Sequence, residues 1–283
     1  MKIKVDYAEC GFDGVLYPAN GRLDKVIIVV SGSDGGLGHA KKMARWFQQN
    51  NVPTLAVGYF ATKHTGKYLE KVPIEYIDRA VSFLKQQGYE KVGIQGLSKG
   101  TEYAILAAAE NTEISCVILK TPSWFASEVI STRQPSASSC WTRNGEEIPY
   151  TPYKIRQFNL LQYMKETGEY NLLKVNSGKD VTQESVLPIE KVNGPVLLFS
   201  TEADNIWPSK EGAEKLMSLL DDAAFVFPHK HICYRCMCHF MMENANSMTR
   251  LISKSEKQYP EECAAERKNM GEETLNWIEK VWQ

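Results

Sequence analysis

The sequence predicts an α/β protein built on a mostly parallel, doubly wound sheet. Apolar, β-branched runs of strand length recur along the chain, most clearly at residues 25–31 and 194–201. Such runs are typical of strands that are covered on both faces, as they are in parallel sheets. Amphipathic or alanine-rich segments of helical length separate the runs. This strand–helix alternation is the pattern of a doubly wound sheet.

The first elements form a hairpin and a strand that ends in glycines. Short β-like runs at Lys2–Tyr7 and Gly14–Ala19 are separated by Cys10–Asp13, so we expect them to pair as an opening hairpin. The next run, Lys25–Ser31, is a strand with a continuous apolar stretch at Val26–Val30, and it leads into the Gly-rich loop Gly32–Gly38. A helix follows, because apolar residues recur there at helical spacing: Met43, Ala44, Trp46 and Phe47.

The same strand–helix unit then recurs twice. Pro is tolerated in the first turn of a helix, so we expect a helix to begin at Pro73 and to run towards Gly88. An alanine-rich helix is expected over Lys99–Glu110. The strands of this region are predicted at Thr54–Phe60, Lys91–Ser98 and Ile114–Lys120.

The alternation stops at Thr121. From there to about Lys191 the chain is rich in Ser, Thr, Pro and Asn, with one helical piece over Asn159–Glu166. Long insertions in compact domains are usually functional, so we predict that residues 121–191 form a cap over the sheet. We therefore expect one domain, residues 1–283, with this cap inserted. The final elements are expected at Gly194–Thr201 (strand), Ser209–Leu220 (helix), His231–Cys236 (strand) and from Gly271 onward (helix).

Composition excludes several classes of function. The formal net charge is −1, so no overall basic field exists to hold a nucleic acid. No stretch approaches the roughly 20 apolar residues that a membrane span needs, and the first residues lack the apolar core of a signal peptide. These features predict a soluble, cytoplasmic protein. The seven cysteines are an odd count in a chain of this size, which favours reduced thiols over a disulfide framework.

One motif indicates a nucleophile. Gly96-Leu97-Ser98-Lys99-Gly100 fits the pattern G-x-S-x-G, with an apolar strand before it and a helix after it. In this context the serine lies on a tight strand-to-helix turn, and the small residues two before and two after relieve crowding. The hydroxyl is then exposed at a helix N-terminus, where the helix dipole favours developing negative charge. We therefore predict that Ser98 is a nucleophile.

A serine nucleophile needs a base and an acid that orients the base. In folds that carry this turn, the acid and the histidine follow the serine in that order. Asp204 comes just after the strand at 194–201 and is the predicted acid, with Glu202 as the alternative. A helix cap or a turn is another ordinary role for Asp at such a position.

The predicted base is His239. It comes just after the last predicted strand, and catalytic groups gather at the carboxyl ends of parallel strands. His39 and His64 precede the serine, which is the wrong order, and His229 and His231 lie at the beginning of the last strand. A structural role is the alternative for His239.

Two backbone N–H groups are expected to bind the oxyanion of a tetrahedral intermediate. One is the N–H of Lys99, directly after the nucleophile. The second should come from the Gly-rich loop, where Ser33 is the candidate and Asp34 the alternative. This loop contains neither G-x-G-x-x-G nor a terminal G-K-[ST], so a nucleotide site is disfavoured.

A competing interpretation involves zinc. Cys233, Cys236, Cys238 and His239 have donor types and a C-x-x-C spacing that suit zinc. No second C-x-x-C or histidine pair lies nearby, and residues that alternate along a strand do not all face one ion. We therefore expect no metal and no other cofactor, since triad chemistry needs none.

These motifs together resemble one branch of the α/β-hydrolases. The resemblance covers about Gly14 to Glu243 and rests on the runs VVSGSDGGL, VGIQGLSKGTEYAI, LPIEKVNGPVLLFSTEADNIWPS and CHF. They are similar to the catalytic domain of acyl-CoA thioesterases and bile acid-CoA:amino acid N-acyltransferases. The resemblance implies a triad of Ser98, Asp204 and His239. It also implies hydrolysis rather than amide formation, because the acyltransferases of this family use cysteine and the thioesterases use serine.

The leading hypothesis is therefore a serine hydrolase of small-molecule acyl thioesters, most of all acyl-CoA, in fatty acid metabolism. The alternatives are a general carboxylesterase or peptidase with the same triad, and a non-catalytic scaffold of the same fold. Trp124 and Trp141 fall within the predicted cap, and their position makes them candidates to line an acyl pocket.

Overall fold

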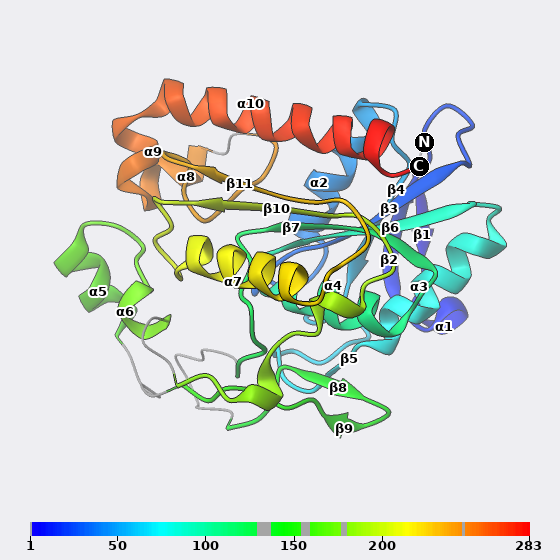
Figure 1. The fold of residues 1–283 in the computed structure, drawn as a ribbon, viewed down its shortest axis with the longest axis horizontal. Coiled ribbons are helices and arrows are strands. Elements are labelled where there is room, and N and C mark those ends of the chain that lie inside the picture. Colours follow the sequence, from blue (N-terminus) through cyan, green and yellow to red (C-terminus); the bar gives the residue numbers. More distant parts are fainter. Residues whose placement is uncertain (1, 129–136, 154–158, 177–179, 245–246) are drawn as a thin grey trace.

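An eight-stranded sheet runs through the molecule (Figure 1). The computed structural model describes residues 2–128, 137–153, 159–176, 180–244 and 247–283. The strand order is β1-β2-β4-β3-β6-β7-β10-β11. From β4 to β11 every neighbouring pair is parallel, whereas β2 pairs antiparallel with both β1 and β4. The strands are β1 (Ile3–Val5), β2 (Asp13–Tyr17), β3 (Lys25–Val30), β4 (Thr54–Gly58), β6 (Lys91–Leu97), β7 (Ile114–Lys120), β10 (Val196–Thr201) and β11 (His229–Tyr234).

Helices cover both faces of this sheet, which confirms the doubly wound architecture. One face packs against α3 (Glu75–Gln86), α4 (Lys99–Glu110) and α7 (Ser209–Asp222). The other packs against α2 (Gly38–Gln49) and α10 (Pro260–Asn276), and α10 lies across the top of Figure 1. All six residues of β3 are buried because successive side chains enter the two opposite cores.

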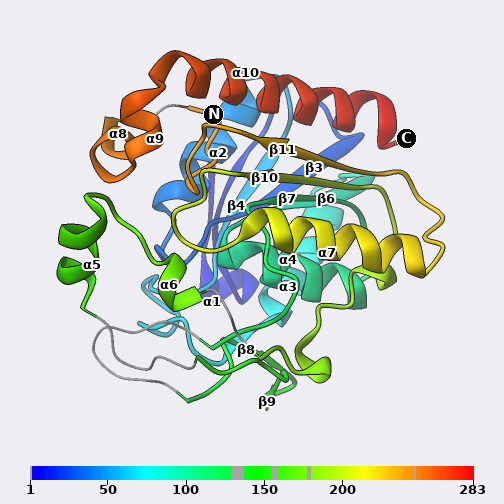
Figure 2. The ribbon, with the colours of Figure 1, turned by 60° about the vertical axis from the view of Figure 1, so that its left-hand side comes forward.

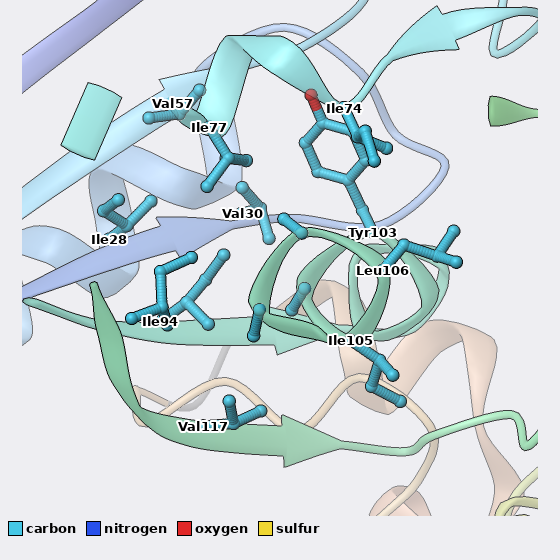
Figure 3. Close-up of a cluster of buried hydrophobic side chains, with 14 of the residues drawn as sticks. Ile28, Val30, Val57, Ile74, Ile77, Ile94, Tyr103, Ile105, Leu106 and Val117 are labelled. Carbon is cyan, nitrogen blue, oxygen red and sulfur yellow. The ribbon is translucent and has the colours of Figure 1, made fainter. Parts of the chain in front are cut away.

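The core beneath α4 shows how this layer is held (Figure 3). Aliphatic side chains from four strands meet those of α3 and α4, and the apolar area that they bury is a main source of the stability of this layer. The labelled members are Ile28, Val30, Val57, Ile74, Ile77, Ile94, Tyr103, Ile105, Leu106 and Val117.

The segment between β7 and β10 leaves the main sheet. It contributes β8 (Trp141–Arg143) and β9 (Glu146–Glu147) to a small second sheet, in which β5 (Val72–Pro73) pairs with β8. It also contains the helices α5 (Leu160–Thr167) and α6 (Leu173–Asn176), which lie near the start of α7 in Figures 1 and 2, and two 3-10 turns at Gln183–Ser185 and Ile189–Lys191. Whether the chain is one domain with a cap at about 121–191 stays a prediction.

Two expectations about local structure were wrong, and the expected opening hairpin was confirmed. Pro73 lies in β5, not in a helix, because the N–H groups of Val72 and Ile74 donate to Cys140 and Thr142 while proline has none to donate. The opening hairpin forms, but a short helix α1 (Tyr7–Cys10) lies between its strands.

The closing helix was also placed wrongly. It begins at Pro260, eleven residues before the expected Gly271, and continues as a π-helical turn over Trp277–Val281. It is preceded by α8 (Ser247–Ile252) and α9 (Lys254–Gln258). Within the described ranges, no helix combines the length and the apolar character that a bilayer span requires.

Candidate active site

Ser98 lies on a tight turn between β6 and α4. Its backbone has φ 57° and ψ −127°, a conformation that is strained for a residue with a side chain. The turn is possible because the residues two before and two after Ser98 are glycines. A Cβ on Gly96 would overlap the carbonyl of Gly100, and a Cβ on Gly100 would overlap the carbonyl of Ser31. The predicted need for small residues at both positions is therefore visible in the geometry.

The three predicted triad residues come together. The Oγ of Ser98 lies 2.8 Å from Nε2 of His239, and Nδ1 of His239 lies 2.9 Å from both carboxylate oxygens of Asp204. The side chains of His239 and Asp204 are almost fully buried, and Ser98 is buried at 9 % exposure. The serine hydroxyl, the imidazole and the carboxylate thus form one chain of hydrogen bonds, which is the arrangement that activates a serine.

Asp204 is itself held by the backbone. Its Oδ1 accepts the N–H groups of Ile206 and Trp207, at 2.9 and 3.1 Å. The indole ring of Trp207 stands perpendicular to the His239 ring, with 5.0 Å between the ring centroids. The alternative acid, Glu202, is exposed and pairs with Lys210, so it is not the partner of His239.

The other four described histidines have partners elsewhere. Each of three pairs with a carboxylate, and the fourth contacts a serine hydroxyl: His39 with Asp34, His64 with Asp13, His229 with Asp221 and His231 with Ser200. None of these four pairs includes Ser98, and His239 is the histidine whose ring contacts the serine hydroxyl; its role as the base stays a prediction.

Buried charges support the His239 loop, the segment that carries His239 and spans residues 235–244 after β11. Glu243 pairs with Lys120 at 2.5 Å, and both side chains are almost completely excluded from water. Burial lowers the pKa of Lys120, and the carboxylate of Glu243 opposes that effect. Lys120 also anchors the nucleophile turn, since its carbonyl accepts the N–H of Ser98 at 2.9 Å. This pair was not found by sequence reasoning.

Acidic side chains of the last helices hold the same loop from the other side. Glu266 of α10 accepts the backbone N–H groups of Arg235, Cys236 and Met237. Glu256 of α9 accepts the N–H of Cys238 at 3.3 Å. These contacts fix the backbone of the loop just before His239.

A second buried ion pair lies directly behind the nucleophile. The Nζ of Lys99 contacts both carboxylate oxygens of Glu102, at 2.9 and 3.1 Å, and the hydroxyl and carbonyl of Ser127. Glu102 also accepts the indole N–H of Trp141 at 2.9 Å. Although burial works against the charge of Lys99, its anionic surroundings hold its pKa above the ordinary range. The i,i+3 spacing of Lys99 and Glu102 was the available sequence signal.

The oxyanion candidates lie beside Ser98. Gly32 approaches so closely that an added Cβ would be 2.9 Å from Cβ of Ser98, and Ser33 is the next residue. The hydroxyl of Tyr59 donates to the carbonyls of Ser31 and Gly32, which fixes the start of this loop. The N–H groups of Ser33 and Lys99 stay a prediction as oxyanion donors.

The cysteines near His239 do not share a site with it. Both ring nitrogens of His239 face other partners, namely Ser98 and Asp204. Burial raises the pKa of the Cys236 and Cys238 thiols, which disfavours the thiolate that zinc needs. In the described part of the chain, no three His, Cys, Asp or Glu side chains are grouped as a metal site would require.

Comparison with known sequences gives the family. The family model described as "BAAT / Acyl-CoA thioester hydrolase C terminal" matches residues 72–244, a span that contains all three triad positions. Acyl-coenzyme A amino acid N-acyltransferase 1 of Mus musculus is 25 % identical over 207 residues, which are 69 % of this chain and 43 % of that protein. Acyl-coenzyme A thioesterase 6 of Mus musculus is 23 % identical over 189 residues, 65 % of this chain and 41 % of that protein. The chain thus matches less than half the length of these relatives.

Solved structures agree on the fold. The α/β hydrolase GrgF from Penicillium sp. sh18 has a TM-score of 0.53 at 16 % identity, over 85 % of this chain and 91 % of that chain. Est1E from Butyrivibrio proteoclasticus, solved with ferulic acid, has a TM-score of 0.56 at 17 % identity, over 98 % of this chain and 100 % of that chain. This chain has the α/β-hydrolase fold, and it belongs to the BAAT / acyl-CoA thioester hydrolase C-terminal family of hydrolase-type enzymes.

Proposed function

We propose that this protein is a serine hydrolase that cleaves acyl thioesters, with Ser98 as nucleophile, His239 as base and Asp204 as the residue that orients the base. The observation that carries the proposal is the unbroken hydrogen-bond chain from Ser98 through His239 to Asp204. An ordinary structural serine does not need a strained backbone at a helix N-terminus together with a buried, oriented imidazole.

In the first half of the reaction, Oγ of Ser98 attacks the thioester carbonyl while Nε2 of His239 takes the hydroxyl proton. Negative charge develops on the carbonyl oxygen, where the N–H groups of Lys99 and Ser33 would donate. The carbon–sulfur bond then breaks, the acyl group stays on Ser98 as an ester, and the sulfur leaves as a thiol with the proton from His239. The carboxylate of Asp204 stabilises the imidazolium while it carries that proton.

In the second half, water replaces the thiol. His239 takes a proton from the water as its oxygen attacks the ester carbonyl of the acyl-serine. The bond from the acyl carbon to Oγ breaks, the proton returns to Ser98, and a carboxylic acid leaves. The protein regains its starting state, so the cycle needs no cofactor.

Membership of this family favours thioesters over other acyl donors as substrates. Both the N-acyltransferase and the thioesterase that this chain resembles have acyl-coenzyme A in their names. Serine at the nucleophile position supports hydrolysis, since the resemblance associates transfer to an amine with cysteine. A general carboxylesterase or peptidase uses the same triad, and the relative rates on thioesters, esters and amides distinguish these activities.

Turnover of acyl-CoA tests the proposal. We expect the purified protein to release free CoA from at least one acyl-CoA, and to do so faster than it cleaves the matched nitrophenyl ester. Ser98→Ala should lower the rate at least about a thousandfold. Ser82→Ala, a surface serine of α3, is the matched control and should behave as wild type. Equal hydrolysis by Ser98→Ala would contradict the proposal, and a well-folded protein that turns over no acyl donor would indicate a non-catalytic scaffold.

A further inference from the structure

A cavity lies between the segment that follows β7 and the start of α7, and Trp207, whose ring contacts His239, forms part of its wall. Its volume is about 120 Å³. Aromatic and proline side chains form much of its wall, namely Pro122, Trp124, Phe125, Trp207 and Pro208. Of the two tryptophans that the sequence suggested for an acyl pocket, Trp124 lines this cavity. Trp141 instead stacks on Tyr103, with 4.9 Å between ring centroids, and its indole N–H donates to the carboxylate of Glu102.

Trp207 lines this cavity and also contacts two residues of the proposed triad. Its ring contacts the His239 ring at 5.0 Å between centroids, and its backbone N–H donates to Asp204. Its indole N–H donates to the carbonyl of Thr121 at 3.0 Å, which links the end of β10 to the segment after β7. The ring is 8 % exposed and packs with Tyr153, Leu172 and Val175. It is therefore held in place from several directions.

The polar side chains of the wall already have partners. Ser123 donates to the carbonyl of Phe125, and the hydroxyl of Ser127 accepts from Lys99. Asn176 donates to the carbonyl of Ile206 and accepts from the hydroxyl of Tyr153. An occupant would thus gain free energy mainly by apolar contact.

One charged side chain also lines the cavity. Glu211 lies in the first turn of α7 and is exposed to solvent. A negative charge at this place repels a carboxylate that enters the cavity, whereas it leaves an uncharged group unaffected.

We propose that this cavity receives the acyl group of the substrate, that the group is small and uncharged, and that Trp207 sets its size. The inference rests on the proposed function and specifies its substrate class. An apolar cavity of about 150 Å³ accommodates a benzene molecule, which has six carbons, so this smaller space fits a straight acyl group of roughly four to six carbons. The Trp207 ring forms one wall of this space and would limit longer chains.

An acyl-CoA series from acetyl to palmitoyl, with benzoyl-CoA, tests the size limit. We expect kcat/KM to peak between butyryl and hexanoyl and to fall at least about tenfold by palmitoyl. Trp207→Phe should move the peak to longer chains, and Trp207→Ala should move it further, because each substitution removes more of the wall. Trp282→Phe is the matched control, since this buried tryptophan packs near Gly93 in the core on the opposite face of the sheet.

A second variant tests the charge. Wild type should cleave butyryl-CoA at least about tenfold faster than succinyl-CoA, whose acyl group ends in a carboxylate. Glu211→Gln should reduce that preference severalfold. This exposed position should tolerate the change, so the result does not depend on whether Trp207→Ala folds.

Graded alkyl fluorophosphonates separate this inference from the proposed function. These probes react with an activated serine without needing turnover, so butyl, octyl and hexadecyl probes report the room beside Ser98 directly. Slow labelling by the hexadecyl probe that speeds up in Trp207→Phe supports the inference. Equal labelling by all chain lengths, or a chain-length profile that Trp207→Phe leaves unchanged, would overturn it even if Ser98-dependent hydrolysis is found. Size-graded labelling without any turnover would instead overturn the proposed hydrolysis.

Discussion

The two halves of the proposed triad are held by different means. On the serine side, backbone fixes the geometry: Ser98 lies between two glycines, and its N–H bonds the carbonyl of Lys120. On the histidine side, the loop before and after His239 is held by buried or partly buried charged side chains, among them Glu243 and Glu266. The serine turn depends most on the close approach of backbone neighbours, with the buried Lys99–Glu102 pair beside it. The His239 side depends on ionic contacts from distant parts of the chain.

This difference predicts how each half tolerates change. A turn held by backbone contacts has almost no room for an added atom, because interiors are close-packed. A loop held by charged side chains accepts changes of shape but not the loss of one partner, since the remaining charge is then buried alone. The serine side should therefore be sensitive to volume and the histidine side to charge.

The largest effect is expected from Gly100→Ala. Its new Cβ would overlap the carbonyl of Ser31, so the turn has to move or the fold has to open. We expect a loss of about 3 kcal/mol or more in the free energy of unfolding, and a loss of fluorophosphonate labelling at Ser98. Urea unfolding and intact-mass measurements would show both. Gly38→Ala is the control, because nothing lies within 4 Å of a Cβ there; equal stability of the two variants would contradict the account of the turn.

Glu243→Gln should have the next largest effect. It leaves the ammonium of Lys120 buried without its counter-charge, which costs about 3 kcal/mol of stability and displaces the His239 loop. The double variant Lys120→Met with Glu243→Met removes both charges and should recover most of that stability. Chemical denaturation of wild type, the single variant and the double variant measures these differences in the free energy of unfolding. A single variant as stable as wild type, or a double variant worse than the single, would refute a role for the ion pair.

Glu266→Ala should be milder. It removes the acceptor for three backbone N–H groups at the start of the His239 loop, but Glu266 itself is only partly buried. Since hydrogen bonds to a charged acceptor contribute about 1.5–3 kcal/mol, we expect a loss of about 2 kcal/mol. The rate of labelling at Ser98 should fall as well, because the base is less well placed. Glu262→Ala, an exposed position of the same helix, should change neither quantity.

The smallest effects concern pH and lie in β11, which leads into the His239 loop. Burial lowers the pKa of His231, so its contribution to stability is present above about pH 6.5 and is lost as the pH falls through its lowered pKa. The carbonyl of Phe227 and the carboxylate of Asp221 raise the pKa of His229. That contribution is present below about pH 6.5 and is lost as the pH rises through the raised pKa.

Unfolding at about pH 5.5 and about pH 8 separates these two histidines. Wild type should lose stability between about pH 8 and about pH 5.5, and His231→Asn should make that loss smaller. His229→Asn should cost about 0.5 kcal/mol at the lower pH and less at the higher one, because its pair with Asp221 is largely exposed. If both variants changed the pH dependence of stability in the same direction, the assigned pKa shifts would be contradicted.

The serine half could be predicted from the sequence because its cause is local. Gly96, Ser98 and Gly100 lie within five residues, and the strand and helix around them have clear patterns. Asp204 and His239 followed from their order and from strand ends. The parallel sheet was also predictable, since buried β-branched runs marked its strands.

The supports of the histidine half could not be predicted in this way. Lys120 and Glu243 lie 123 positions apart, and nothing in the pattern of either residue indicates its partner. The same holds for Pro73, whose strand exists only because the backbone at residues 140 and 142 pairs with it. Such features come from tertiary contacts, which local propensity does not encode.

The most direct test of the central claim is intact-mass analysis after a fluorophosphonate probe, on wild type, Ser98→Ala and His239→Gln. We predict one adduct on wild type, none on Ser98→Ala, and labelling of His239→Gln slowed about a thousandfold or more, since the base that activates the serine is missing. An adduct that persists on Ser98→Ala, or wild-type labelling of His239→Gln, would show that Ser98 and His239 do not act as nucleophile and base.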